Sequence, residues 1–134
     1  MNGVSYRLLF FWGFVTYSAI FFLWAVLAAY GLSHGIGAQI TSYVVTFIAV
    51  YLAARSIGNS TLVAAVAYGV GFGVVHIFLD ALVVLPAIGL VAFFSPYVWL
   101  EYGIVAISPV VYALTAKLLR APAFTPPSPI ESTQ

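Results

Sequence analysis

Between Leu8 and Ala116 the chain carries only three charged side chains, and this scarcity of charge limits what it can fold into. Arg55 falls in an expected turn, whereas Asp80 and Glu101 interrupt apolar segments. Of the 134 residues, 64% are hydrophobic and 5% are charged, against roughly 45–50% and about 25% in soluble domains. A soluble domain of this size could not hide so much apolar surface. The composition therefore indicates an integral membrane protein.

Apolar segments long enough to cross a hydrocarbon core of roughly 30 Å occur four times. The expected spans are residues 8–30, 38–54, 61–85 and 97–119. We therefore expect an all-α fold, in which residues 1–120 form a bundle of four transmembrane helices. The Pro-rich segment 121–134 is unsuited to a helix or a strand, and we expect it to be a disordered cytoplasmic tail.

The end of the third span has two interpretations. Pro86 should break or kink the helix, and the apolar stretch 86–96 would then lie in the outer interface or dip back as a short re-entrant segment. Alternatively, the third span runs from about 65 to 93 with a kink at Pro86. Asp80 would then move toward the middle of the membrane.

The basic residues predict the orientation of the bundle, because connections rich in Lys and Arg face the cytoplasm. If the N-terminus is cytoplasmic, four spans place every basic residue on the cytoplasmic side: Arg7, Arg55, Lys117 and Arg120. The two outer connections contain no Lys or Arg. We therefore expect both termini inside the cell and the protein in the inner or plasma membrane of a prokaryote.

Helical spacing gives the third span a distinctive face. Gly69, Gly73, His76 and Asp80 follow the i, i+4, i+7 and i+11 positions and so share one stripe. The two glycines form a small-xxx-small pattern, which allows another helix to approach closely. We expect the glycines to pack against a neighbouring helix and the two ionisable groups to lie further out.

The fourth span repeats this arrangement, with Glu101, Val105 and Ser108 on one face. Pro109 lacks a backbone donor and should kink the helix, which frees the carbonyl of Val105. A freed carbonyl can coordinate water or an ion, although a proline kink more often only shapes the bundle.

The second span has small and polar side chains at helical spacing: Gln39, Ser42, Thr46, Ala49 and Ala53. The first span is rich in Phe and Trp, although Gly13 and Tyr17 share a face. We expect the second, third and fourth spans to pack most closely, while the first faces lipid or another subunit.

The helical rise places Asp80 and Glu101 at similar heights, in the outer third of the membrane. His76 lies one turn deeper, and His34 lies in the outer connection between the first two spans. We expect an outward-facing pocket that binds a proton, a cation or another ligand, formed by Asp80, Glu101, His76, Tyr102 and Ser108.

This cluster has three interpretations. The carboxylates can hold the bundle together through hydrogen bonds or simply reach outer water. They can form a proton or cation relay, because acids beside a His within a membrane are typical of transport. They can also bind zinc, manganese or iron, with candidate ligands His34, His76, Asp80 and Glu101.

The region from His76 to Leu119 contains the pair Leu79–Asp80, Tyr97 or Tyr102, and Pro109. In this it resembles small uncharacterised four-span bacterial membrane proteins, which have no assigned activity. The resemblance implies a fold and no mechanism. The small multidrug resistance transporters are a poor match, because their essential glutamate lies in the first span and this first span has no acid.

Two function classes stay open. The first is a small transporter or channel-like subunit, working as a homo-oligomer, with Asp80 and Glu101 as coupling groups. The second is a non-enzymatic accessory or assembly subunit of a larger membrane complex, which would dock through the Phe-rich first span and the glycine stripe.

Enzyme activity is not indicated, because the sequence has no phosphate loop, HExxH motif or Ser-His-Asp spacing. The chain contains no Cys, which excludes thiolate metal sites and disulfides. A net charge of +1 argues against nucleic acid as a partner. We expect the lipid bilayer as the main partner and no cofactor.

Overall fold

The structure is a computed structural model that describes residues 4–58 and 61–120, and α-helix is the only regular secondary structure in them. The helices are α1 (Tyr6–Ala29), α2 (Ile36–Ile57), α3 (Leu62–Val83), α4 (Leu85–Phe93) and α5 (Pro96–Arg120). All except α4 are long and apolar enough to cross a membrane. The all-α fold and the four candidate membrane helices are therefore confirmed. The expected tail, 121–134, lies outside the described residues.

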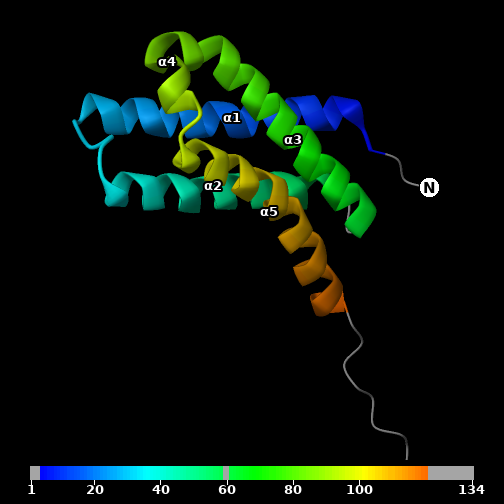
Figure 1. Cartoon of the computed structure of the whole chain (residues 1–134). Helices are drawn as coiled ribbons and strands as arrows, with labels where there is room; N and C mark the ends of the chain where they lie inside the picture. The colour runs from blue at the N-terminus through cyan, green and yellow to red at the C-terminus, as the bar shows by residue number, and fades with distance from the viewer. Residues whose placement is uncertain (1–3, 59–60, 121–134) are drawn as a thin grey trace, which may run out of the picture.

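The four long helices form a ring in which each packs against two neighbours. The largest contact joins α3 to α5 and the next joins α2 to α5, while α1 packs less extensively against α2 and α3. Figure 1 shows α1 and α2 side by side, with α3 and α5 crossing them at an angle. The expected close packing of the second, third and fourth spans is only half right, since α2 and α3 lie across the ring from each other.

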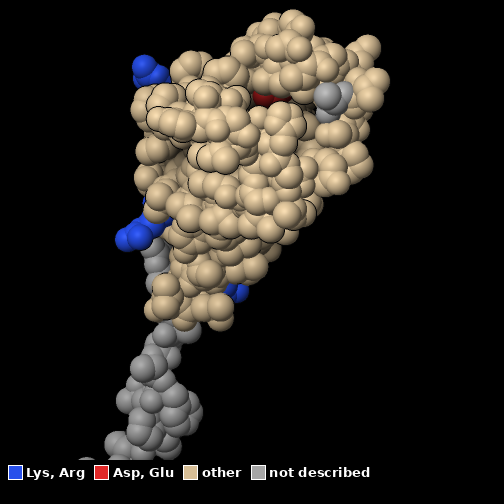
Figure 2. Space-filling view, turned by 90° about the vertical axis from the view of Figure 1, so that its left-hand side faces the viewer, with Lys and Arg blue, Asp and Glu red and all other residues tan. Residues whose placement is uncertain are grey.

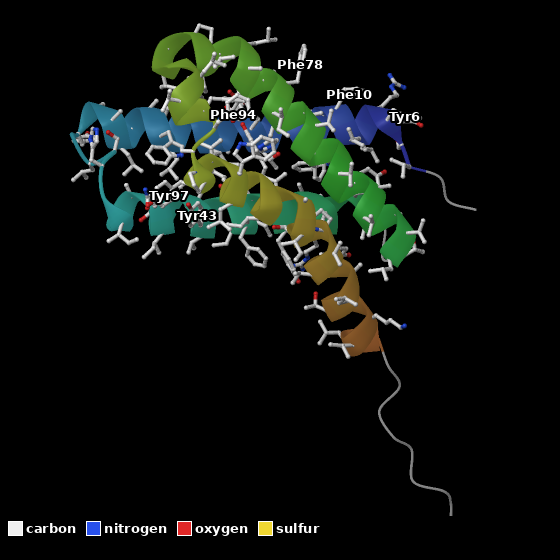
Figure 3. The ribbon with its side chains drawn as sticks, in the orientation of Figure 1. Tyr6, Phe10, Tyr43, Phe78, Phe94 and Tyr97 are labelled. Carbon is white, nitrogen blue, oxygen red and sulfur yellow. The ribbon has the colours of Figure 1, made fainter. Side chains whose placement is uncertain are left out.

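The centre of the ring is filled by side chains from all four long helices. The core cluster consists of Leu9, Val50, Ala53, Ala64, Tyr68, Phe72 and Val105. Many large apolar side chains lie on the outside instead, and Figure 3 shows Tyr6, Phe10 and Phe78 pointing away from the bundle. An outer surface of this kind suits contact with lipid, because exposed apolar area is rarely so extensive in soluble proteins.

Glycine determines how closely α3 approaches its neighbours. A Cβ atom added at Gly69 would overlap the carbonyl oxygen of Ala106 in α5 and lie 3.0 Å from its carbonyl carbon. A Cβ atom at Gly73 would meet no atom within 4 Å. Gly69 therefore lies against the backbone of α5, whereas Gly73, although buried, leaves space beside it. The glycine that sequence reasoning missed is Gly71, where an added Cβ would overlap the side chain of Leu9.

The third span takes the shorter of its two expected registers. α3 ends at Val83, and Val84 separates it from α4. Continuing the helix would press the Pro86 ring against the carbonyl four residues earlier and remove a hydrogen bond. Residues 65–93 are therefore not one continuous helix. Most of the stretch 86–96 is helical, with a break at Gly89, whose φ is +78°.

α5 continues through Pro109, whose side chain is fully buried. Figure 1 shows α5 bending in its second half, as a proline inside a helix predicts. Near its start, the hydroxyl of Tyr43 in α2 donates to the backbone carbonyl of Tyr97 at 3.3 Å, and Figure 3 shows these two residues close together.

The two ends of the bundle differ in charge. The start of α1 and the ends of α2 and α5 lie at the same end of the bundle (Figure 1). This end carries Arg7, Arg55 and Lys117. The α1–α2 connection and α4 lie at the opposite end, which we call the α4 end. Within the described residues, no Lys or Arg belongs to that end.

Candidate functional site

A cavity of about 470 Å³ lies among α1, α3, α4 and α5. Its walls are mostly apolar, and three ionisable residues, His76, Asp80 and Glu101, contribute to them. Five aromatic residues also line it: Tyr17, Phe21, Trp24, Phe93 and Tyr102. Figure 2 looks at the molecule from the α4 end and shows acidic atoms, in red, deep in a hollow of the surface.

Asp80 of α3 is held by two tyrosine hydroxyls from different helices. Tyr17 of α1 donates to Oδ1 at 3.0 Å, and Tyr102 of α5 donates to Oδ2 at 2.6 Å. A hydrogen bond from a hydroxyl to an ionised carboxylate is shorter and stronger than one between neutral groups. The carboxyl group therefore links α1 to α5, two helices that otherwise share few close contacts.

Glu101 of α5 is held by α2. The hydroxyls of Ser42 and Thr46, one helical turn apart and both fully buried, donate to Oε1 at 2.8 and 2.7 Å. The second oxygen, Oε2, accepts no hydrogen bond from residues 4–58 or 61–120. No buried side-chain oxygen in this part of the chain lacks a partner. Oε2 is therefore not sealed in the interior, and Glu101 lines the cavity.

His76 lies one turn before Asp80 and is almost fully buried, with 4% of its surface exposed. Its Nε2 atom is 3.1 Å from the hydroxyl oxygen of Thr16. That hydroxyl has one hydrogen and also lies 2.8 Å from the carbonyl oxygen of Trp12 and 3.1 Å from that of Gly13, both in α1. We assign this hydrogen to a carbonyl, which is the common arrangement for a threonine within a helix, and we therefore assign Nε2 as the donor to Thr16.

The other ring nitrogen of His76, Nδ1, is consequently an acceptor. No side chain of the described residues hydrogen-bonds to it, and none of their buried side-chain nitrogens is unsatisfied. Because His76 lines the cavity, Nδ1 faces it. The ring of Tyr17 meets the imidazole edge-on, with 5.5 Å between the ring centroids, and helps to hold its orientation.

Four of the five predicted pocket residues line this one cavity: Asp80, Glu101, His76 and Tyr102. Ser108 does not. It is fully buried and donates to the carbonyl of Ile104, within its own helix, at 2.6 Å. Ser108 lies seven residues after Glu101, roughly 10 Å further along the helix axis, so it shares the face of Glu101 but not its depth.

The four-ligand metal site is not assembled. His34 is exposed in the α1–α2 connection, where Nδ1 lies 3.2 Å from the Ser33 hydroxyl, and it does not line the cavity. Within residues 4–58 and 61–120, no three His, Asp or Glu side chains lie close enough together to hold a metal ion.

The residues that sequence reasoning missed are the partners of the ionisable groups. Tyr17 and Thr16 come from α1, which was expected to contribute least, although Gly13 and Tyr17 had been placed on one face. Ser42 and Thr46 belong to the polar stripe of the second span, for which the sequence predicts only close helix packing. The sequence signal that could have identified them is the pair of hydroxyls one helical turn apart on that stripe, which can both donate to one carboxylate.

Comparisons with protein-family models, with curated proteins and with solved structures found no match for this chain. The site's chemistry therefore rests on its geometry. Two carboxyl groups and one imidazole contribute to the lining of a largely apolar cavity, and no Lys or Arg of the described residues lines it. Such a site can take up a proton or a cation.

Proposed function

We propose that this chain is a four-span integral membrane protein of a prokaryotic cell membrane and works as a small transporter or channel-like subunit. Its N-terminus and the end of α5 face the cytoplasm, and the cavity faces outward. The gathering of Arg7, Arg55 and Lys117 at the end opposite α4 supports this orientation, because basic residues stay on the cytoplasmic side.

The observation that carries the proposal is the sharing of one apolar cavity by Asp80 and Glu101. A carboxylate inside a membrane is costly, and it usually marks a path or a binding site for ions or protons. Neither carboxyl group has a Lys or Arg beside it in the cavity lining. A proton or cation from outside would therefore supply the missing positive charge.

The hydrogen-bond partners of the two acids suit repeated loading and release. Within the described residues, every side chain that hydrogen-bonds to the two acids does so through a hydroxyl: Tyr17, Tyr102, Ser42 and Thr46. A hydroxyl can donate to a carboxylate and can also accept from a carboxylic acid, whereas Lys and Arg can only donate. The acids can therefore gain and lose a proton while these partners stay in place.

A complete path across the membrane requires more than this cavity. Phe72, Val50 and Val105 are fully buried in the core of the bundle. Ions therefore need either a rearrangement of the helices or a second copy of the chain, and we include a homo-oligomer in the proposal for this reason.

The accessory-subunit alternative loses part of its support. It required the glycine stripe as a docking surface, but Gly69 is covered by α5. The docking surface that this alternative still has is the exposed aromatic surface of α1, formed by Phe10, Phe11, Phe14 and Phe22.

The test is ion flux in liposomes that contain the purified protein and a pH-sensitive dye. We expect Asp80→Asn and Glu101→Gln to abolish flux driven by an imposed pH gradient or membrane potential. Glu131→Gln is the matched control, because it neutralises the third acid, outside the described residues. Circular dichroism and size-exclusion chromatography establish that each variant folds.

Folded Asp80→Asn and Glu101→Gln proteins with wild-type flux would contradict the transport proposal. Failure of Asp80→Asn to insert or assemble, together with an absence of flux in the wild-type protein, would favour the accessory role.

A further inference from the structure

We infer that the cavity binds an organic cation with an apolar body, such as an aryl- or alkylammonium ion. This inference rests on the proposed function, which treats the cavity as a solute site, and it adds the chemical class of the solute.

The size and walls of the cavity favour a molecule over a bare ion. Its volume of about 470 Å³ falls within the 300–1,000 Å³ that is usual for small-molecule sites. Most of the wall is hydrocarbon, contributed by residues such as Ile20, Val83 and Ile88. Hard inorganic cations need a cage of oxygen ligands, and these walls do not supply one. An apolar body fills the same space favourably.

The electrostatics of the lining favour a positive charge on that molecule. Asp80 and Glu101 line the cavity without a Lys or Arg among the other lining residues. Aromatic rings attract cations through their negative faces, and Trp is the strongest of them. Trp24 and Phe21 of α1 line the cavity together with the two acids. An anion would meet repulsion from both groups.

His76 adds a directional contact. The side chain is almost fully buried, and its Nε2–H donates to the Thr16 hydroxyl. The lone pair of Nδ1 is therefore available to a ligand in the cavity. The N–H of a primary, secondary or tertiary ammonium ion can donate to this atom or to Glu101, whereas a quaternary ammonium ion relies on its charge and its apolar body alone. A neutral hydrocarbon cannot use either acceptor.

The rim of the cavity matches the same class of ligand. Phe21, Val83 and Ile88 line the cavity and are also about half exposed, so the rim is apolar on α1, α3 and α4. An amphiphilic cation can concentrate in the outer leaflet and enter past these side chains, with its charge directed toward the acids.

The test is equilibrium binding of phenyltrimethylammonium to the purified full chain in lipid nanodiscs, measured by calorimetry. Its neutral isostere, tert-butylbenzene, has the same shape without the charge. We expect the cation to bind at least about tenfold more tightly than the isostere, since desolvated cation–π and carboxylate contacts are both lost. Na⁺ and K⁺ at equal concentrations should not displace it.

Substitutions identify which side chains of the lining contact the cation. Asp80→Asn and Glu101→Gln should each weaken binding of the cation by about tenfold, and Trp24→Leu by about threefold to tenfold. Phe22→Leu is the matched control, because it removes a ring from α1 two residues away, where the side chain is 70% exposed and does not line the cavity. It should bind the cation as the wild-type protein does.

Equal affinity for the cation and the isostere would overturn the inference, and so would displacement by Na⁺ at equal concentration. If phenyltrimethylammonium fails to bind while flux that depends on Asp80 persists, the inference is wrong and the transport proposal stands. If the cation binds as expected but no flux is found, the inference holds and transport is wrong.

Discussion

The crossing of α3 and α5 provides a sharp test of the packing, because Gly69 and Gly73 lie one turn apart and differ in what a methyl group would meet. At Gly69 the added Cβ would overlap the Ala106 carbonyl oxygen and lie 3.0 Å from the carbonyl carbon. Carbon atoms attract at about 3.5–4.0 Å, so the two helices must separate by roughly half an ångström or more. The obstacle is backbone, which cannot turn aside as a side chain can.

The expected cost follows from this geometry. Overpacking a well-packed contact costs about 1–3 kcal/mol, and we expect Gly69→Ala to lower the free energy of unfolding by about 2 kcal/mol. Gly73→Ala meets open space, so it should change that free energy by less than about 1 kcal/mol, with alanine's better helix propensity favouring stabilisation.

The assay is reversible unfolding in mixed micelles of increasing SDS content, followed by circular dichroism at 222 nm. Gly73→Ala serves as the matched control for Gly69→Ala, since both make the same chemical change on α3. Equal stabilities for the two variants would refute the close approach of α3 and α5 at Gly69.

The hydrogen bonds of the cavity yield two further predictions. A double-mutant cycle of Tyr102→Phe and Asp80→Ala in the same unfolding assay should give a coupling energy of about 1–2 kcal/mol, because their 2.6 Å contact is lost in either variant. A coupling near zero would argue against this contact. Nitrogen-15 NMR of the wild-type protein should show the neutral imidazole of His76 protonated at Nε2, and Thr16→Val should disturb that preference. Protonation at Nδ1 in the wild-type ring would contradict the assigned tautomer.

Much of the fold could be predicted from the sequence, because each element depends on local chemistry. Spans follow from the length of apolar segments, whereas the end of α3 stayed open between two registers, because a proline can either end a helix or only kink it. The shared stripe of His76 and Asp80 also needed only the period of a helix. These features do not depend on which helix packs beside which.

The hydrogen-bond partners of the ionisable groups could not be predicted without knowing which helices pack together. Tyr17 and Asp80 are 63 residues apart, and only the ring order of the helices brings them to 3.0 Å. Helical spacing placed Ser108 on the face of Glu101 but left its depth undecided. Gly73 was likewise on the predicted stripe, yet a Cβ atom added there would meet nothing within 4 Å, whereas one at Gly69 would meet the backbone of α5.

The central claim is that Asp80 and Glu101 share a cavity that opens outward. The chain contains no Cys, so a single Val98→Cys substitution places one thiol in the cavity lining and leaves both acids intact. Right-side-out vesicles are treated with membrane-impermeant methanethiosulfonates that carry either a trimethylammonium or a sulfonate group. The reaction rates are normalised to those of a free thiol, and Ser108→Cys, at a fully buried position, is the unreactive control.

The account predicts that the thiol at position 98 reacts from the outside and that the cationic reagent reacts faster. Combining Asp80→Asn with Glu101→Gln should remove that preference for the cation. Labelling only from the cytoplasmic side, or equal normalised rates for the two reagents, would contradict an outward-facing acidic cavity.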